Sequence, residues 1–127
     1  MSLANPYVQY QQNAVQTAAP GELTLMLYNG LVRFNKQAIN ALRQEDLHSS
    51  NEALLRSQEI VSYLNETLDP NYELSQHLSA LYVFMNEQLI QANIKKEPQI
   101  VEDVLGLAEE LRDTWQQAIS ISRENGY

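Results

Sequence analysis

The two histidines are the side chains whose spacing comes nearest to a metal site. Glu45 and His48 have the Glu-x-x-His spacing that supplies ligands in carboxylate-bridged di-iron helix bundles. A bundle of that kind needs a second copy of the motif on another helix, and the sequence has none. Glu73 and His77 are four residues apart, which is the wrong spacing for the motif. We therefore expect both histidines at the solvated surface and predict no metal and no cofactor.

His77 is also the candidate phosphoacceptor of an alternative, a histidine phosphotransfer bundle. Such sites have a His-x-x-Lys-Gly pattern, in which the Lys offsets the phosphate charge and the Gly admits the partner. Here the same positions read His77-Leu78-Ser79-Ala80-Leu81, without the cation. The chain also has no Cys, no Gly-rich phosphate loop and no plausible Ser-His-Asp arrangement. The sequence therefore favours a binding protein over an enzyme, with phosphotransfer kept as an alternative.

The composition indicates a folded, acidic, single-domain protein. With 127 residues, 44% of them hydrophobic, the chain is long enough to bury a core as one domain, residues 1–127. The 16 acidic and 8 basic residues give a formal net charge of -8, which would repel nucleic acid and anionic lipid. No apolar run approaches the length of a membrane span, and no signal peptide is visible. We expect a cytoplasmic protein that neither binds nucleic acid nor inserts into a membrane.

Four amphipathic segments are expected to form the helices that position these side chains. Pro20 stands at a first helical position, and Ser49 and Glu52 have the spacing of a capping box. Pro70 ends one helical pattern and Pro98 opens another. After an N-terminal arm of residues 1–18, the expected helices cover residues 20–44, 49–68, 72–96 and 98–121. We predict an all-α fold, an antiparallel up-down four-helix bundle with a mobile N-terminal arm.

Two of the expected helices carry apolar residues on two faces. In the 72–96 helix, the residues expected in the core are Leu81, Tyr82, Met85, Leu89 and Ala92. The other face of this helix carries Val83, Ile90 and Ile94. In the 20–44 helix, the face opposite the expected core carries Leu25, Tyr28, Val32 and Ile39. A helix that serves one core needs only one apolar stripe, so the second stripes need a further cover.

The second stripes can be covered in two compatible ways. The N-terminal arm or a neighbouring subunit could bury them, or a partner's amphipathic helix could bind there, as in other helix-in-groove complexes. An arm with Tyr7 and Tyr10 could lie in the groove when it is empty and leave when the partner arrives. We predict a monomer in the free state and keep a homodimeric helical scaffold as an alternative. The candidate partner-binding residues are Tyr7, Tyr10, Leu25, Tyr28, Val32, Ile39, Val83, Ile90 and Ile94.

A set of residues spread over nearly the whole chain has the spacing of a known family. The set comprises Tyr10, residues 17–23, residues 26–30, Leu81, Tyr82, Met85, Leu89, residues 91–93 and Trp115. Together these residues resemble the flagellin-specific export chaperones, the FliS family. The resemblance implies a cytosolic four-helix bundle that binds the disordered C-terminal segment of flagellin, prevents premature polymerisation and delivers flagellin to the flagellar type III export apparatus. It also implies that the arm, through Tyr10 and Tyr7, helps to cover the flagellin site and to engage an export-gate component.

Overall fold

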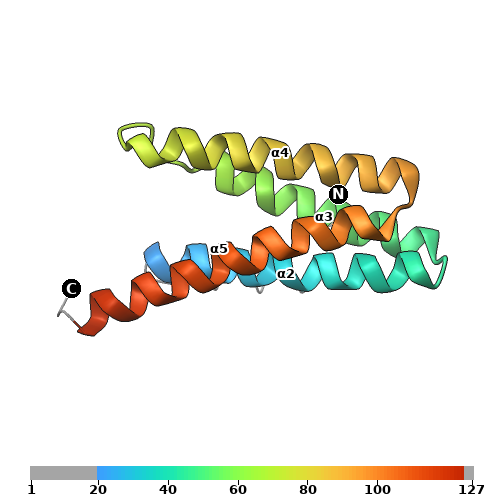
Figure 1. Cartoon of the computed structure of the whole chain (residues 1–127), viewed down its shortest axis with the longest axis horizontal. Helices are drawn as coiled ribbons and strands as arrows, with labels where there is room; N and C mark the ends of the chain where they lie inside the picture. The colour runs from blue at the N-terminus through green and yellow to red at the C-terminus, as the bar shows by residue number, and fades with distance from the viewer. Residues whose placement is uncertain (1–19, 125–127) are drawn as a thin grey trace, which may run out of the picture.

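The computed structural model describes residues 20–124, with side chains for residues 21–122, and this part of the chain forms four α-helices and no strand. Figure 1 shows them side by side in an elongated bundle: α2 (Pro20–Arg43), α3 (Leu47–Glu66), α4 (Glu73–Lys95) and α5 (Pro98–Glu124). Each helix packs against the next along the chain, and α5 returns to pack against α2. The predicted all-α four-helix bundle is confirmed, whereas the predicted arm lies outside the described residues.

Short loops make consecutive helices antiparallel. The loops cover residues 44–46, 67–72 and 96–97. The bounds of α2 and α4 lie within one residue of those expected from the sequence, α3 begins and ends two residues earlier, and α5 continues three residues further. Helix α4 ends where Lys96 adopts a left-handed backbone conformation, with φ 54° and ψ 45°. None of the described helices has both the length and the apolar character needed to cross a membrane.

The cap of α3 is Asp46. Its Oδ1 atom accepts a hydrogen bond from the backbone N–H of Ser49 at 3.1 Å, and its Oδ2 atom accepts one from Ser49 Oγ at 2.8 Å. These two bonds lower the pKa of the Asp46 carboxyl group. The predicted capping box that begins at Ser49 is therefore wrong, because the carboxylate three residues earlier takes the cap position and binds Ser49 itself.

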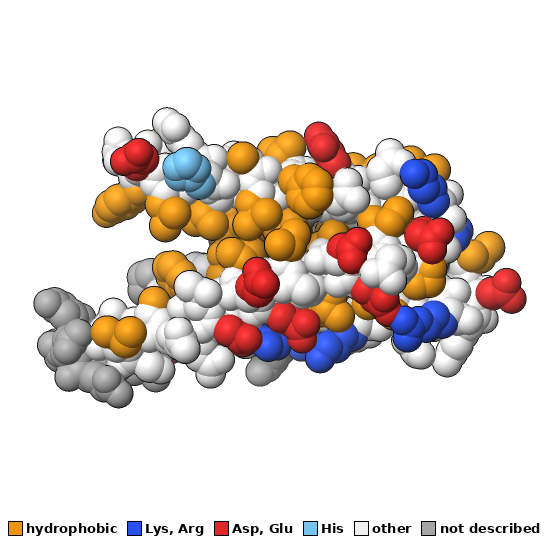
Figure 2. Space-filling view, in the orientation of Figure 1, with side chains coloured by type: hydrophobic (Ala, Val, Ile, Leu, Met, Phe, Trp, Pro, Cys, Tyr) orange, Lys and Arg blue, Asp and Glu red, His pale blue; other side chains and the backbone are white. Residues whose placement is uncertain are grey.

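The core is fully buried in one half of the bundle and opens toward the other. Residues with no more than 1% of their surface exposed include Leu31, Ala38, Leu54, Val61, Met85, Leu89, Val101, Val104 and Ala108. Toward the end where α2 and α4 begin, burial decreases, because Leu27, Leu78, Leu81, Leu111 and Trp115 are only partly buried. Figure 2 shows a notch at this end, between the first half of α4 and the last half of α5, with hydrophobic side chains at its base.

Trp115 holds the open end of the bundle together on one side. Its Nε1–H group donates a hydrogen bond to the Gly21 carbonyl oxygen at 2.8 Å, which ties α5 to the first turn of α2. A Cβ atom at Gly21 would lie 3.6 Å from Ile119 Cγ1, so the backbone of α2 runs close to α5 here. The first half of α4 therefore lies across the notch from a fixed pair of helices.

Candidate partner-binding surface

Three of the predicted partner-binding residues form an exposed row along α4. Val83, Ile90 and Ile94 have 47%, 43% and 69% of their surface exposed. They are seven and four residues apart, so they lie on one side of the helix. At a rise of 1.5 Å per residue, this α4 row is about 16 Å long. It is apolar surface that the other described residues leave open.

Polar contacts join α3 and α4 beside the α4 row. Asn93 Nδ2 donates a hydrogen bond to Asn51 Oδ1 at 2.7 Å, and Asn86 Nδ2 donates one to Ser62 Oγ at 3.0 Å. We call these four residues the α3–α4 seam. Asn86 Oδ1 is buried and has no hydrogen-bond partner among the described residues. Since Asn86 and Asn93 stand between the α4 row and the buried face of α4, the row is separate from the core.

The corresponding residues of α2 lie in the core instead. Tyr28, Val32 and Ile39 have only 3%, 5% and 8% of their surface exposed, and Leu25 is half-buried. The prediction of an exposed second stripe on α2 is therefore wrong for Tyr28, Val32 and Ile39. Helix α2 packs against both α3 and α5, so two neighbours cover a broad arc of its surface.

Tyr28 also reaches across the bundle to α4. Its Oη atom lies 2.6 Å from Tyr82 Oη, and both rings are buried. Burial raises the pKa of both hydroxyl groups, because a phenolate would lose its hydration in the core. The hydrogen bond adds to the rise at Tyr82 and opposes part of the rise at Tyr28. Tyr28 is thus a packing and hydrogen-bonding residue that fixes α4 against α2.

The two histidines lie on the surface, as expected from the sequence. His48 Nε2 is 3.6 Å from Glu52 Oε1, one turn further along α3, and His77 is exposed on α4. Glu45 belongs to the loop before α3 and has a positive φ of 58°. Among the described side chains, no group of three or more His, Cys, Asp or Glu residues is arranged to hold a metal ion.

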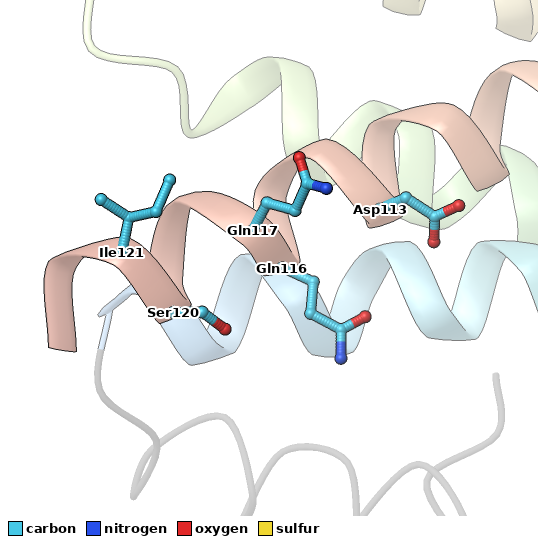
Figure 3. A pocket seen from close by; sticks show the side chains of 5 residues that line it. All are labelled: Asp113, Gln116, Gln117, Ser120 and Ile121. Carbon is cyan, nitrogen blue, oxygen red and sulfur yellow. The ribbon is translucent and has the colours of Figure 1, made fainter. Parts of the chain in front are cut away.

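Surface hollows give no arrangement of converging catalytic groups in the described part of the chain. One hollow is lined by Asp113, Gln116, Gln117, Ser120 and Ile121. Figure 3 shows that all five side chains project from the single helix α5. Another lies between α2 and α3 and is lined by Arg33, Phe34, Gln37, Ser49, Glu52, Ala53 and Arg56. The Arg33 guanidinium stacks over the Phe34 ring, 5.3 Å from its centroid, so this cation is already engaged with its own helix.

Sequence reasoning missed two features of the surface. Leu55 of α3 is 46% exposed and lies one turn after Asn51 of the seam, so α3 contributes apolar surface beside α4. Leu74 shares the core stripe of the 72–96 helix by spacing, yet it is 62% exposed at the open end. Helical spacing assigns a residue to a side of its helix but does not tell whether a neighbour covers that side. Tyr7 and Tyr10 lie outside the described residues.

Comparison with known proteins identifies the class as a flagellar secretion chaperone. The family model described as "Flagellar protein FliS" matches residues 3–122, and this chain therefore belongs to the FliS family. The flagellar secretion chaperone FliS of Bacillus subtilis (strain 168) is 46% identical over 98% of this chain and 94% of that protein. The protein of the same name from Salmonella typhimurium is 33% identical over 84% of this chain and 81% of that protein.

A solved structure agrees with the fold. A crystal structure of a flagellar chaperone from bacteria superposes with a TM-score of 0.75, covering 92% of this chain and 97% of that chain. Its sequence identity is 20%, so the likeness concerns the arrangement of the helices.

Proposed function

We propose that this protein is a cytoplasmic export chaperone that binds the disordered C-terminal segment of flagellin on the α4 row. The observation that carries the proposal is the exposure of Val83, Ile90 and Ile94 in one line, in a chain of the FliS family. Large exposed apolar patches mark interaction sites, and the α4 row supplies three exposed apolar side chains on one side of a helix. The same binding prevents premature polymerisation, because a covered segment cannot join another flagellin subunit.

The dimensions of the α4 row suit a helical partner segment. A stripe of about 16 Å corresponds to roughly three turns of helix. A disordered segment that folds on binding loses conformational entropy, so an apolar track of this kind is needed to offset that cost. The net affinity stays moderate for the area buried, which suits a chaperone that must release flagellin at the flagellar type III export apparatus.

The N-terminal arm completes the proposal. In the absence of flagellin, the arm covers part of the apolar surface through Tyr7 and Tyr10, and flagellin displaces it. The released arm is then free to engage an export-gate component. Helix α2, whose first residue is Pro20, begins at the open end of the bundle (Figure 1).

Substitutions in the α4 row test the proposal directly. Val83→Asp and Ile90→Asp each place a charge in the apolar track and should weaken binding of a flagellin C-terminal peptide by at least about tenfold. Both side chains are substantially exposed, so the melting temperature should change little. Isothermal titration calorimetry measures the affinity and circular dichroism the melting temperature.

Gln91→Asp is the matched control, since Gln91 is an exposed polar residue of α4 next to Ile90 in sequence but outside the α4 row. Its affinity should equal that of the wild type. Unchanged affinity in both Val83→Asp and Ile90→Asp would rule out the α4 row as the flagellin site.

A further inference from the structure

The exposed side of α2 carries no acidic residue. From Leu23 to Arg43 the sequence contains no Asp or Glu, although the chain has 16 of them. The exposed polar residues of this helix stand three or four positions apart, so they lie on one side of it. At 1.5 Å per residue they extend over about 21 Å, and each side chain carries at least one N–H donor. We call them the α2 strip: Asn29, Arg33, Lys36, Gln37, Asn40 and Arg43.

The positive charge of the α2 strip is concentrated in its middle. Arg43, at one end, pairs with Glu102 of α5. Lys36 is exposed and takes part in no ion pair among the described residues. The Arg33 guanidinium lies over the Phe34 ring, 5.3 Å from its centroid, a contact that holds the group in place and leaves its charge intact. Arg33 and Lys36 are therefore the main cations that the strip presents to a partner.

The hollow between α2 and α3 lies beside this middle part. Arg33 and Gln37 line it from α2, Arg56 lines it from α3, and the buried Phe34 and Ala53 also border it. Its volume is about 370 Å³. A guanidinium group has five N–H donors in a planar fork that matches a carboxylate. The hollow thus offers a carboxylate two such groups, one from each helix.

Carboxylates border the strip on both sides. On α3, Glu52 lines the hollow and Glu59 Oε2 lies 3.2 Å from Arg56 Nη1, while on α5 Glu102 pairs with Arg43. Figure 2 shows blue side chains along the lower edge of the molecule, where Figure 1 places α2, with red side chains next to them. A nucleic acid or an anionic membrane would meet these borders and be repelled, whereas a single narrow segment fits between them.

The α2 strip and the α4 row lie on opposite sides of the bundle. Helices α2 and α4 each pack against both α3 and α5, so they stand diagonally to each other. Figure 1 shows them along opposite edges of the molecule. A partner on the strip therefore does not compete with a segment bound on the α4 row.

We propose that the α2 strip binds an acidic segment of a partner protein, on the side of the bundle that the α4 row leaves open. Carboxylates of the segment accept hydrogen bonds from Arg33 and Lys36, and one acidic side chain enters the hollow beside Arg56. The Debye length at physiological salt is about 8 Å, so these contacts outweigh repulsion from the more distant residues that give the net charge of -8. The strip stands on its own charges and exposure and does not depend on the proposed function.

Two synthetic peptides of one length test the charge of the segment, with Glu in one peptide and Gln in the other at the same positions. Fluorescence anisotropy at about 0.15 M salt should show binding of the Glu peptide alone. The double variant Arg33→Gln and Lys36→Gln should weaken that binding by at least about fivefold. The control Lys95→Gln and Lys96→Gln removes the same charge from exposed residues at the end of α4, and its effect should stay below about twofold.

A second variant guards against a change of structure at Arg33. Asn40→Asp places a negative charge on the strip without altering the contact between Arg33 and Phe34, and it should weaken binding of the Glu peptide by about threefold. Gln91→Asp adds the same charge to an exposed residue of α4 and should have no such effect. Circular dichroism should show similar melting temperatures for all these variants, because the substituted side chains are exposed.

The lysines of the chain locate the bound peptide directly. The sequence has three of them, Lys36 on the strip and Lys95 and Lys96 at the end of α4. A carbodiimide joins a carboxylate to a lysine amine that touches it, with loss of water. Mass spectrometry should therefore find the Glu peptide linked to Lys36 and not to Lys95 or Lys96.

The outcomes that would overturn the inference are distinct from those that bear on flagellin. No binding of the Glu peptide, equal effects of the two double variants, or cross-links at Lys95 and Lys96 in place of Lys36 would overturn the strip. Binding of single-stranded RNA or phosphatidylserine vesicles, or self-association, that is lost in the Arg33→Gln and Lys36→Gln variant would overturn the assignment to a partner's acidic segment. Binding of a flagellin C-terminal peptide should be unchanged in that variant, and Glu-peptide binding unchanged in Val83→Asp, so either proposal can fail alone.

Discussion

Tyr28 and Tyr82 show how two single residues fix the position of α4. Their Oη atoms are 2.6 Å apart, and Tyr82 has only 2% of its surface exposed. Removing one hydroxyl group leaves the other buried without this partner, which costs about 1–3 kcal/mol. Tyr82→Phe should therefore lower the free energy of unfolding by that amount in urea titrations at neutral pH. The double variant Tyr28→Phe and Tyr82→Phe should lose less than the sum of the two single variants, because they share one interaction.

The same pair predicts a loss of stability at high pH. The ordinary tyrosine pKa is 10.0, and burial raises the pKa of both hydroxyl groups above it in the folded protein. Above pH 10 the unfolded chain loses these protons while the folded chain keeps them, so the contribution is fully present below pH 10 and declines as the pH rises.

Urea titrations between about pH 8 and pH 11 measure this decline. The free energy of unfolding should fall more steeply in the wild type than in the double variant Tyr28→Phe and Tyr82→Phe. Parallel pH profiles in the two proteins would contradict the account of the pair.

Helices α2 and α4 explain which part of the binding surface the sequence could predict. In α2, Tyr28 lies about 60° around the helix from the fully buried Leu31, and the buried Asn35 lies between them, about 40° from Leu31. In α4, Asn86 and Asn93 interrupt the apolar surface between the core and the α4 row. Both helices therefore carry an asparagine between their two apolar stripes, and in α2 the asparagine is itself buried, because Asn35 Oδ1 accepts a hydrogen bond from Ser57 Oγ of α3 at 2.8 Å. The second stripe of α2 is buried because α2 packs against both α3 and α5, and the sequence of one helix does not show how many neighbours it has.

A local cap at Asp46 and contacts between α3 and α4 near Leu55 explain two features that the sequence did not predict. The sequence predicted a capping box at Ser49 and Glu52, whereas the hydrogen bonds from Ser49 to the Asp46 carboxylate place the cap at Asp46. The place of Leu55 beside the α4 row depends on the pairing of Asn51 with Asn93 and of Ser62 with Asn86. Helical periodicity describes one helix at a time and carries no such information about register.

Helix α5 contains a glycine that its packing does not require. A Cβ atom at Gly106 would meet no heavy atom within 4 Å, and the residue is exposed in the middle of the helix. Gly106→Ala should stabilise the protein by about 0.5–1 kcal/mol, because alanine loses less backbone entropy in a helix. Urea titration with wild type as the reference measures the gain, and a decrease in the free energy of unfolding would contradict the open space described at this position.

At the scale of the whole molecule, the fold follows from patterns that are local in sequence. Four apolar stripes with helical period, joined by short loops, allow few arrangements other than an up-down bundle, and this is the fold of residues 20–124. The loosened end of the bundle does not follow from those patterns. It depends on the separation of α4 from α5 in the part of α4 that precedes Tyr82. The half-buried Leu78, Leu81 and Leu111 mark this open end in the folded structure.

The acidic net charge has a consequence for the choice of partner. A formal charge of -8 disfavours nucleic acid and anionic surfaces and favours encounter with basic segments. Encounter with a basic segment should therefore be faster in low salt than in high salt.

The most direct test of the central claim is co-elution with flagellin in size-exclusion chromatography. The purified protein is mixed with full-length flagellin and, separately, with flagellin that lacks its C-terminal segment. Full-length flagellin should elute as a complex with the wild type and separately from Val83→Asp, and truncated flagellin should elute alone in both mixtures. Co-elution of the truncated flagellin with the wild type, or no complex with the full-length flagellin, would contradict binding of the C-terminal segment.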